Sequence, residues 1–108
     1  MRPVTVSQTG AGSSTVVIPC YMLNPFNIGV AVRATGTVTY TVEHTFDDVF
    51  SPTFNPATAT WFPHTTLVAQ TTSQVGNYAF AVRGIRVTVT AGAGTATLTL
   101  VQSGVASN

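Results

Sequence analysis

Alternation of apolar and polar side chains with a period of two is the feature that most constrains how this chain can fold. It is clearest between residues 36 and 46, where every second side chain is Thr or Glu. The residues between these polar positions are Val38, Tyr40, Val42, His44 and Phe46. A helix would repeat its apolar residues every three or four positions, so this spacing predicts a β-strand with one buried face.

The same alternation recurs along the chain, and no segment shows a comparable helical period. Longer runs cover residues 28–33, 78–82, 85–89 and 95–101. Shorter candidate strands are Val4–Gln8, Ser14–Ile18, Thr58–Phe62 and Thr66–Ala69. About eight short strands with turns roughly every ten residues predict an all-β fold, either an antiparallel β-sandwich or a small barrel.

Two connections between strands have local signals. The step Ala34-Thr35-Gly36 predicts a hairpin between the strands on either side of it. The apolar phase then moves from even positions at Phe80 to odd positions at Ile85, and a slip of one residue at a glycine predicts a β-bulge at Arg83-Gly84. Such a bulge would point Arg83 and Arg86 to the same polar face.

The segment 47–58 contains Pro52 and Pro56, which exclude a central strand and predict a loop. Four aromatic residues lie within or beside this loop: Phe50, Phe54, Trp61 and Phe62. They form either a satellite core that fixes the loop or an apolar patch that anchors a partner subunit. Stacking of a sugar on Trp61 is a third alternative. These four residues, with Arg83 and Arg86, are the candidate partner interface.

Length and hydrophobic content predict one domain with a real core. The chain has 108 residues, of which 44% are hydrophobic, and a chain of this size can bury roughly two-thirds of its surface. The expected domain therefore spans residues 1–108, with residues 1–3 and 103–108 as flexible ends.

Charged residues make up only 6% of the chain, against roughly a quarter in ordinary soluble domains. The basic residues are all Arg, and the acids are Glu43, Asp47 and Asp48. Free monomers usually protect their sheet edges and their solubility with charges, Lys above all. A surface of Thr, Ser, Asn and Gln is easier to desolvate, which favours a protein packed against other subunits.

The charge pattern also disfavours several partners. A net charge of +1 gives no clustered basic face for nucleic acid, and it disfavours an anionic membrane surface. No apolar run approaches the roughly 20 residues of a membrane-spanning helix, and the first residues lack the apolar segment of a secretory signal. Cys20 has no second cysteine to pair with, so we expect it to be a small buried hydrophobe.

Titratable residues gather only at Glu43, His44, Asp47 and Asp48. Asp47 and Asp48 could contribute to a Ca²⁺ site. The alternatives are an ion pair of Glu43 or Asp47 with Arg33, Arg83 or Arg86, or recognition at an interface. His44 and His64 lack the ligand spacing that specifies zinc. We expect His44 to be a hydrogen-bonded core or rim residue, and His64 to lie in a turn after Pro63.

No spacing places a nucleophile beside a base, and the glycine pairs of the chain read as turns rather than as phosphate loops. We therefore expect no enzymatic activity, no catalytic residue and no cofactor or metal.

Three segments together resemble small virion structural proteins of tailed bacteriophages, which are often encoded near the capsid genes. They are the run from Gly36 to Asp48, the proline-punctuated segment to Trp61-Phe62-Pro63-His64, and the run from Gly76 to Thr90. The resemblance covers roughly residues 28 to 102. The segment Val82–Val87 also resembles a strand of jelly-roll adhesion and carbohydrate-binding modules.

The resemblance implies a jelly-roll β-sandwich that decorates or cements a capsid shell. The implied partners are the major capsid protein and further copies of the chain, as a homodimer or homotrimer, without nucleic acid or membrane. The implied location is the outer capsid surface of the virion, after a period in the host cytoplasm. The alternative is a module of the tail or fibre that binds a host surface glycan or another tail protein.

Overall fold

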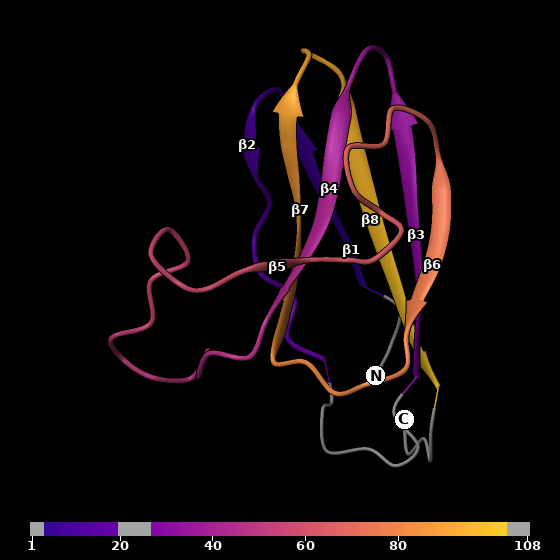
Figure 1. The fold of residues 1–108 in the computed structure, drawn as a ribbon. Coiled ribbons are helices and arrows are strands. Elements are labelled where there is room, and N and C mark those ends of the chain that lie inside the picture. Colours follow the sequence, from indigo (N-terminus) through magenta and orange to yellow (C-terminus); the bar gives the residue numbers. More distant parts are fainter. Residues whose placement is uncertain (1–3, 20–26, 104–108) are drawn as a thin grey trace.

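The computed structural model describes residues 4–19 and 27–103 and contains eight strands in these ranges (Figure 1). They are β1 (Val4–Thr9), β2 (Gly12–Ser13), β3 (Asn27–Thr35), β4 (Thr39–Thr45), β5 (Phe62–Pro63), β6 (Gln74–Tyr78), β7 (Gly84–Ala91) and β8 (Thr95–Ser103). Among the described residues no helix is long and apolar enough to cross a membrane. Cys20 lies outside the described residues, as do residues 1–3 and 104–108. Ser103 was expected in a flexible end, but it is the last residue of β8 and pairs with Asn27.

The strands form two antiparallel sheets, with the orders β1-β8-β3-β6 and β2-β7-β4-β5. Pairing follows a simple rule: β1 with β8, β2 with β7, β3 with β6 and β4 with β5. This is the pattern of one long hairpin folded over on itself, which is a jelly roll. The expected all-β, jelly-roll β-sandwich is therefore confirmed.

The core lies between the sheets and uses the alternation seen in the sequence. Strand β3 buries Ile28, Val30 and Val32, and β8 buries Ala96, Leu98 and Leu100. In and just before β4 the expected inward residues Val38, Tyr40, Val42 and His44 are buried, but Phe46, which follows the strand, is 49% exposed. The prediction failed for Phe46 because β4 ends at Thr45, before the alternation in the sequence does.

The predicted hairpin at residues 34–36 is wrong. Strands β3 and β4 belong to opposite sheets, so the connection between them crosses the sandwich instead of closing a ladder. Alternation shows that a strand has a buried face. It does not show whether the next strand pairs beside it or faces it across the core.

The predicted bulge at Arg83-Gly84 is also wrong. Tyr78 ends β6 in one sheet, and Gly84 begins β7 in the other. The phase of the apolar residues changes because the chain crosses between sheets at residues 79–83. The register shift that does occur lies between Thr39 and Tyr40 of β4.

The shorter candidate strands are confirmed only in part. Residues 4–8 fall in β1, whereas the pairing of residues 14–18 with β7 is limited to single contacts such as Val17 opposite Ile85. Of residues 58–62 only Phe62 enters a strand, and residues 66–69 belong to none.

Three connections that carry the chain between the sheets meet at one end of the sandwich. The Gly10 amide donates to the Gly94 carbonyl at 3.1 Å, and the Gly94 amide donates to the Thr37 carbonyl at 2.8 Å. Gly92 has a φ of 90°, and a Cβ added to it would lie 2.3 Å from the Thr37 carbonyl oxygen. The second and third of these turns pack backbone against backbone, so a Cβ has no room at Gly92 or Gly94.

Candidate interaction surface

Residues 46–61, between β4 and β5, leave the sandwich as a long excursion (Figure 1). This confirms the loop predicted from Pro52 and Pro56. Hydrogen bonds close its base: the Thr60 amide donates to Asp47 Oδ2 at 2.8 Å, and Thr45 Oγ1 donates to the Thr60 carbonyl at 2.8 Å. The excursion is therefore attached to the end of β4 at defined points.

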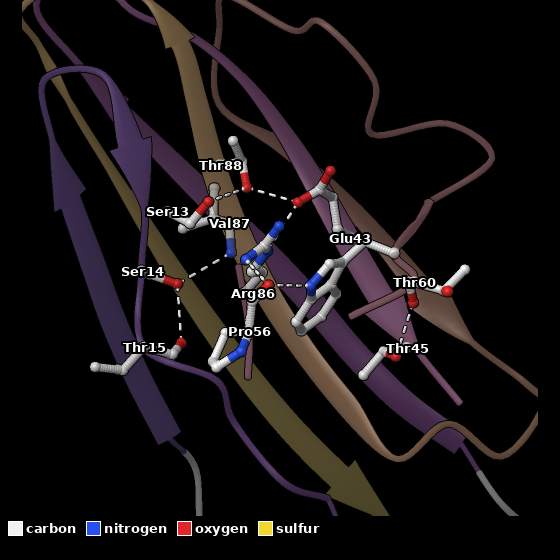
Figure 2. A network of polar contacts seen from close by, with 11 residues as sticks. Ser13, Ser14, Thr15, Glu43, Thr45, Pro56, Thr60, Arg86, Val87 and Thr88 are labelled. Atoms are coloured by element: carbon white, nitrogen blue, oxygen red, sulfur yellow. Dashed lines mark hydrogen bonds and ion pairs between the residues drawn. The ribbon is translucent and has the colours of Figure 1, made fainter. Parts of the chain in front are cut away.

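A network of polar contacts lies on the outer face of β4 and β7 and connects these strands to the excursion (Figure 2). Arg86 Nε donates to Glu43 Oε1 at 2.9 Å, and Thr88 Oγ1 donates to the same oxygen at 2.6 Å. Ser13 of β2 extends the network through a hydroxyl contact of 2.8 Å with Thr88. The ion pair expected for Glu43 is thus present with Arg86, opposite it in the β4–β7 ladder.

Arg86 also holds Trp61. Its guanidinium lies over the indole ring, 4.0 Å from the ring centroid, and Nη1 donates to the Pro56 carbonyl at 3.3 Å. The indole Nε1 of Trp61 donates to the same carbonyl at 2.9 Å. Because the cation covers one face of the indole, that face is not open to a sugar. Contact of Trp61 and Arg86 with a partner remains a prediction.

Arg83 has a looser setting. It lies 3.7 Å from Asp48 Oδ1, and both side chains are well exposed, at 43% and 60%. Exposed ion pairs contribute little to stability, so Arg83 keeps much of its freedom to meet another molecule.

We expect Arg86→Met to loosen the excursion, because it removes the cation from both Glu43 and Trp61. Loss of a partly buried charge partner should lower the free energy of unfolding by about 1–3 kcal/mol. Tryptophan emission should shift to longer wavelength, because Trp61 is the only tryptophan and loses its cover. The exposed Arg33 on β3 supplies the control Arg33→Met. Unchanged emission and stability in Arg86→Met would contradict this role.

Three exposed phenylalanines form a surface that we call the phenylalanine patch: Phe46, Phe62 and Phe80, which are 49%, 45% and 48% exposed. The centroid of the Phe46 ring lies 6.0 Å from that of Phe62 and 6.3 Å from that of Phe80. All three rings contact the imidazole of His44, with centroid distances of 5.5 to 5.9 Å. Phe46 follows β4, Phe62 lies in β5 and Phe80 follows β6, so the patch joins the margins of both sheets.

Beneath the patch, buried polar side chains have defined partners. His44 Nδ1 lies 3.0 Å from the Tyr78 hydroxyl. His64 Nδ1 accepts from the Thr66 amide at 3.1 Å, and its Nε2 lies 2.8 Å from the Asn77 carbonyl. A carbonyl only accepts, so in this arrangement Nε2 carries the proton that is donated to Asn77. His44 is thus the hydrogen-bonded core residue that we expected; His64 is buried and joins β6 to the segment after β5.

Burial lowers the pKa of His44 from the usual 6.5, and a positive charge on the nearby His64 lowers it further. The unfolded chain binds a proton on this residue near pH 6.5, whereas the folded chain does so only at lower pH. Protonation therefore favours the unfolded chain, and stability should fall as the pH drops below about 6.5. Thermal unfolding between pH 7.5 and 5 should show this fall, and His44→Gln should reduce it. An identical pH dependence in both proteins would contradict the assignment to His44.

The other candidate interface residues lie on the excursion. Phe50 is 65% exposed, whereas Phe54 and Trp61 are half-buried. Only Phe62 of the predicted aromatic set belongs to the phenylalanine patch. The alternation placed Phe46 and Phe80 on apolar faces. Phe46 stands at the end of its apolar run, whereas Phe80 lies in the middle of the run 78–82 and has no local signal of exposure.

A shallow depression of about 300 Å³ lies on the excursion. It is lined by Asp47, Asp48, Ser51, Thr53, Phe54, Asn55, Thr58 and Ala59. Asp47 and Asp48 each accept a backbone amide of the excursion, from Thr60 and Phe50. Among the described residues no three His, Cys, Asp or Glu side chains converge as metal ligands.

Comparison of the chain with protein-family models, with curated proteins and with solved structures found no match.

Proposed function

We propose that this chain is a non-enzymatic structural protein of a phage virion, which decorates and cements the capsid shell by binding between major capsid protein subunits. The single observation that carries the proposal is the phenylalanine patch. Three half-exposed rings in contact form a larger apolar surface than scattered residues would, and such patches mark interaction sites.

The contacts that hold the patch in place favour a contact surface. Phe62 lies opposite His44 in the β4–β5 ladder, and His44 is fixed by Tyr78. Rings held in this way lose little conformational entropy when a partner covers them, so burial of their apolar area is converted more fully into affinity.

The low charge content supports the same reading. With only 6% charged residues, most of the surface that surrounds the patch can be desolvated without stripping water from ions. Many such weak contacts, repeated by the symmetry of a shell, would hold neighbouring subunits together. The link to a phage shell comes from the resemblance of residues 28–102, since the jelly-roll fold serves capsid proteins and lectins alike.

A second candidate, glycan binding by a tail or fibre module, is favoured by the depression on the excursion. Its lining combines carboxylates, hydroxyls and an amide with one aromatic ring, Phe54, and such groups hydrogen-bond and stack against sugars. This candidate predicts that the purified chain binds an immobilised host glycan and that Asp48→Ala weakens the binding. Binding to shells with no glycan binding would dismiss it.

The proposal is tested by co-sedimentation of the purified chain with shells assembled from a phage genome in which its coding sequence is deleted. We expect saturable binding at a fixed ratio to the major capsid protein. A chain that stays in the supernatant at tens of micromolar would overturn the proposal.

A further inference from the structure

Strand β1 is an edge strand with no neighbour on its outer side among the described residues. It pairs with β8 in unbroken register over its whole length, from Val4 opposite Leu100 to Thr9 opposite Thr95. Its sequence, Val-Thr-Val-Ser-Gln-Thr, contains no charge and no proline. Free edges are normally blunted by Lys, Pro, a bulge or a very short strand, and β1 has none of these.

The other margins of the sandwich are closed or short. Segment 62–70 pairs with the free side of β4, through Gln70 opposite Tyr40 and through the Val42 carbonyl, which accepts from His64. The same segment covers the edge of β6, where His64 Nε2 contacts the Asn77 carbonyl. At the remaining margin, β2 has only two residues.

The hydrogen-bond phase of β1 shows which backbone groups its outer edge presents. The Gly10 amide donates to the Gly94 carbonyl, one step beyond the pair Thr9–Thr95 in the same register. Antiparallel ladders alternate between hydrogen-bonded and non-bonded pairs. Counting back in steps of two from the bonded pair Gly10–Gly94, the residues of β1 that bond to β8 are Val4, Val6 and Gln8. The amides and carbonyls of Thr5, Ser7 and Thr9 therefore point away from the sheet.

Side-chain contacts agree with this phase. The hydroxyl oxygens of Thr5 and Thr99 lie 3.3 Å apart, those of Ser7 and Thr97 3.1 Å, and those of Thr9 and Thr95 2.9 Å. Such close approach is expected at non-bonded pairs, where opposite side chains are nearest. The outer face of β1 and β8 is thus a ladder of hydroxyl pairs.

We propose that β1 pairs antiparallel with β1 of a second copy of this chain, and so makes a homodimer with a continuous sheet across its two-fold axis. The axis passes at Ser7, which places Thr5 opposite Thr9 of the partner subunit. This register uses every outward amide and carbonyl of Thr5, Ser7 and Thr9.

The strand is self-complementary in this register. On the outer face each hydroxyl side chain meets another hydroxyl, which extends the existing ladder across the axis. Because β1 carries no charge, no like charges face each other when two copies of the strand pair. An isologous contact of this kind closes at two copies, which decides for the homodimer over the homotrimer. The inference does not rest on shell binding.

Analytical ultracentrifugation of the full chain tests the dimer. We expect a species of twice the 11.2 kDa chain mass at tens of micromolar. Ser7→Pro should shift the chain to the monomer, because it removes an outward amide and leaves the bonds to β8 intact. Ser7→Ala keeps the amide and should stay dimeric. A monomeric parent chain, or a dimeric Ser7→Pro variant, would overturn the proposal.

A pair of charge variants tests the register without proline. Thr5→Lys with Thr9→Lys places like charges opposite each other across the axis and should raise the dissociation constant at least tenfold. Thr5→Lys with Thr9→Glu changes the same positions but places opposite charges together, so it should restore the dimer. Equal dissociation constants for the two variants would contradict an axis at Ser7. Shell binding by a monomeric variant, measured separately, distinguishes failure of the dimer from failure of the proposed function.

Discussion

Gly92→Ala is expected to lower the free energy of unfolding by about 3 kcal/mol, which corresponds to a fall of roughly 10–20 °C in the thermal midpoint. Two causes add. The φ of 90° is costly for any residue with a Cβ, and the new Cβ would lie 2.3 Å from the Thr37 carbonyl oxygen. The clash is with backbone atoms. The turn at Gly92 and the turn at Thr37 can therefore separate only if a connection between the sheets moves.

Ala93 supplies the matched control, because it lies in the same turn and is exposed. Ala93→Ser should change the midpoint by no more than a few degrees. Gly94→Ala should resemble Gly92→Ala, since its Cβ would lie 2.4 Å from the Thr35 carbonyl oxygen. A Gly92→Ala protein as stable as Ala93→Ser, measured by circular dichroism on heating, would show that the turns do not pack as described.

Removing the phenylalanine patch is expected to abolish shell binding while the chain stays folded. In the triple variant Phe46→Ser, Phe62→Ser and Phe80→Ser, the affinity for shells should fall at least 100-fold, about 2.7 kcal/mol. The cost to folding should be about 2–4 kcal/mol in total, because each of the three rings is only about half buried in the free chain. Co-sedimentation with shells gives the affinity, and thermal unfolding verifies the fold.

Val75 and Val101 provide a control that removes exposed apolar surface elsewhere. They are 78% and 51% exposed on β6 and β8, away from the patch residues. The double variant Val75→Thr and Val101→Thr should bind shells like the parent chain. If it loses binding while the phenylalanine variant keeps it, the contact surface lies on the sheet of β6 and β8 instead.

The strands were more predictable than their arrangement. Period-two alternation located β3, β4, β7 and β8, because a half-buried strand must alternate. It could not assign strands to sheets: β3 and β4 look like a hairpin in sequence and face each other in the structure. The phase change before Gly84 was misleading for the same reason, since a crossing between sheets and a bulge both shift alternation by one residue.

The interaction surface was predictable only where one segment supplied it. The excursion and its aromatic residues follow from Pro52 and Pro56, and the ion pair of Glu43 with an arginine was among the alternatives. The phenylalanine patch was not foreseen, because it joins Phe46, Phe62 and Phe80 from three separate segments. Its central contact, His44 with Tyr78, spans 34 residues and has no local signal.

Quantitative mass spectrometry of purified virions, grown from the genome that encodes this chain, tests the central claim most directly. The copy number is measured relative to the major capsid protein in the same sample. A protein that cements the shell should be present in hundreds of copies, at a fixed ratio to the major capsid protein. A handful of copies would place the chain in the tail, and its absence from virions would contradict a structural role in the particle.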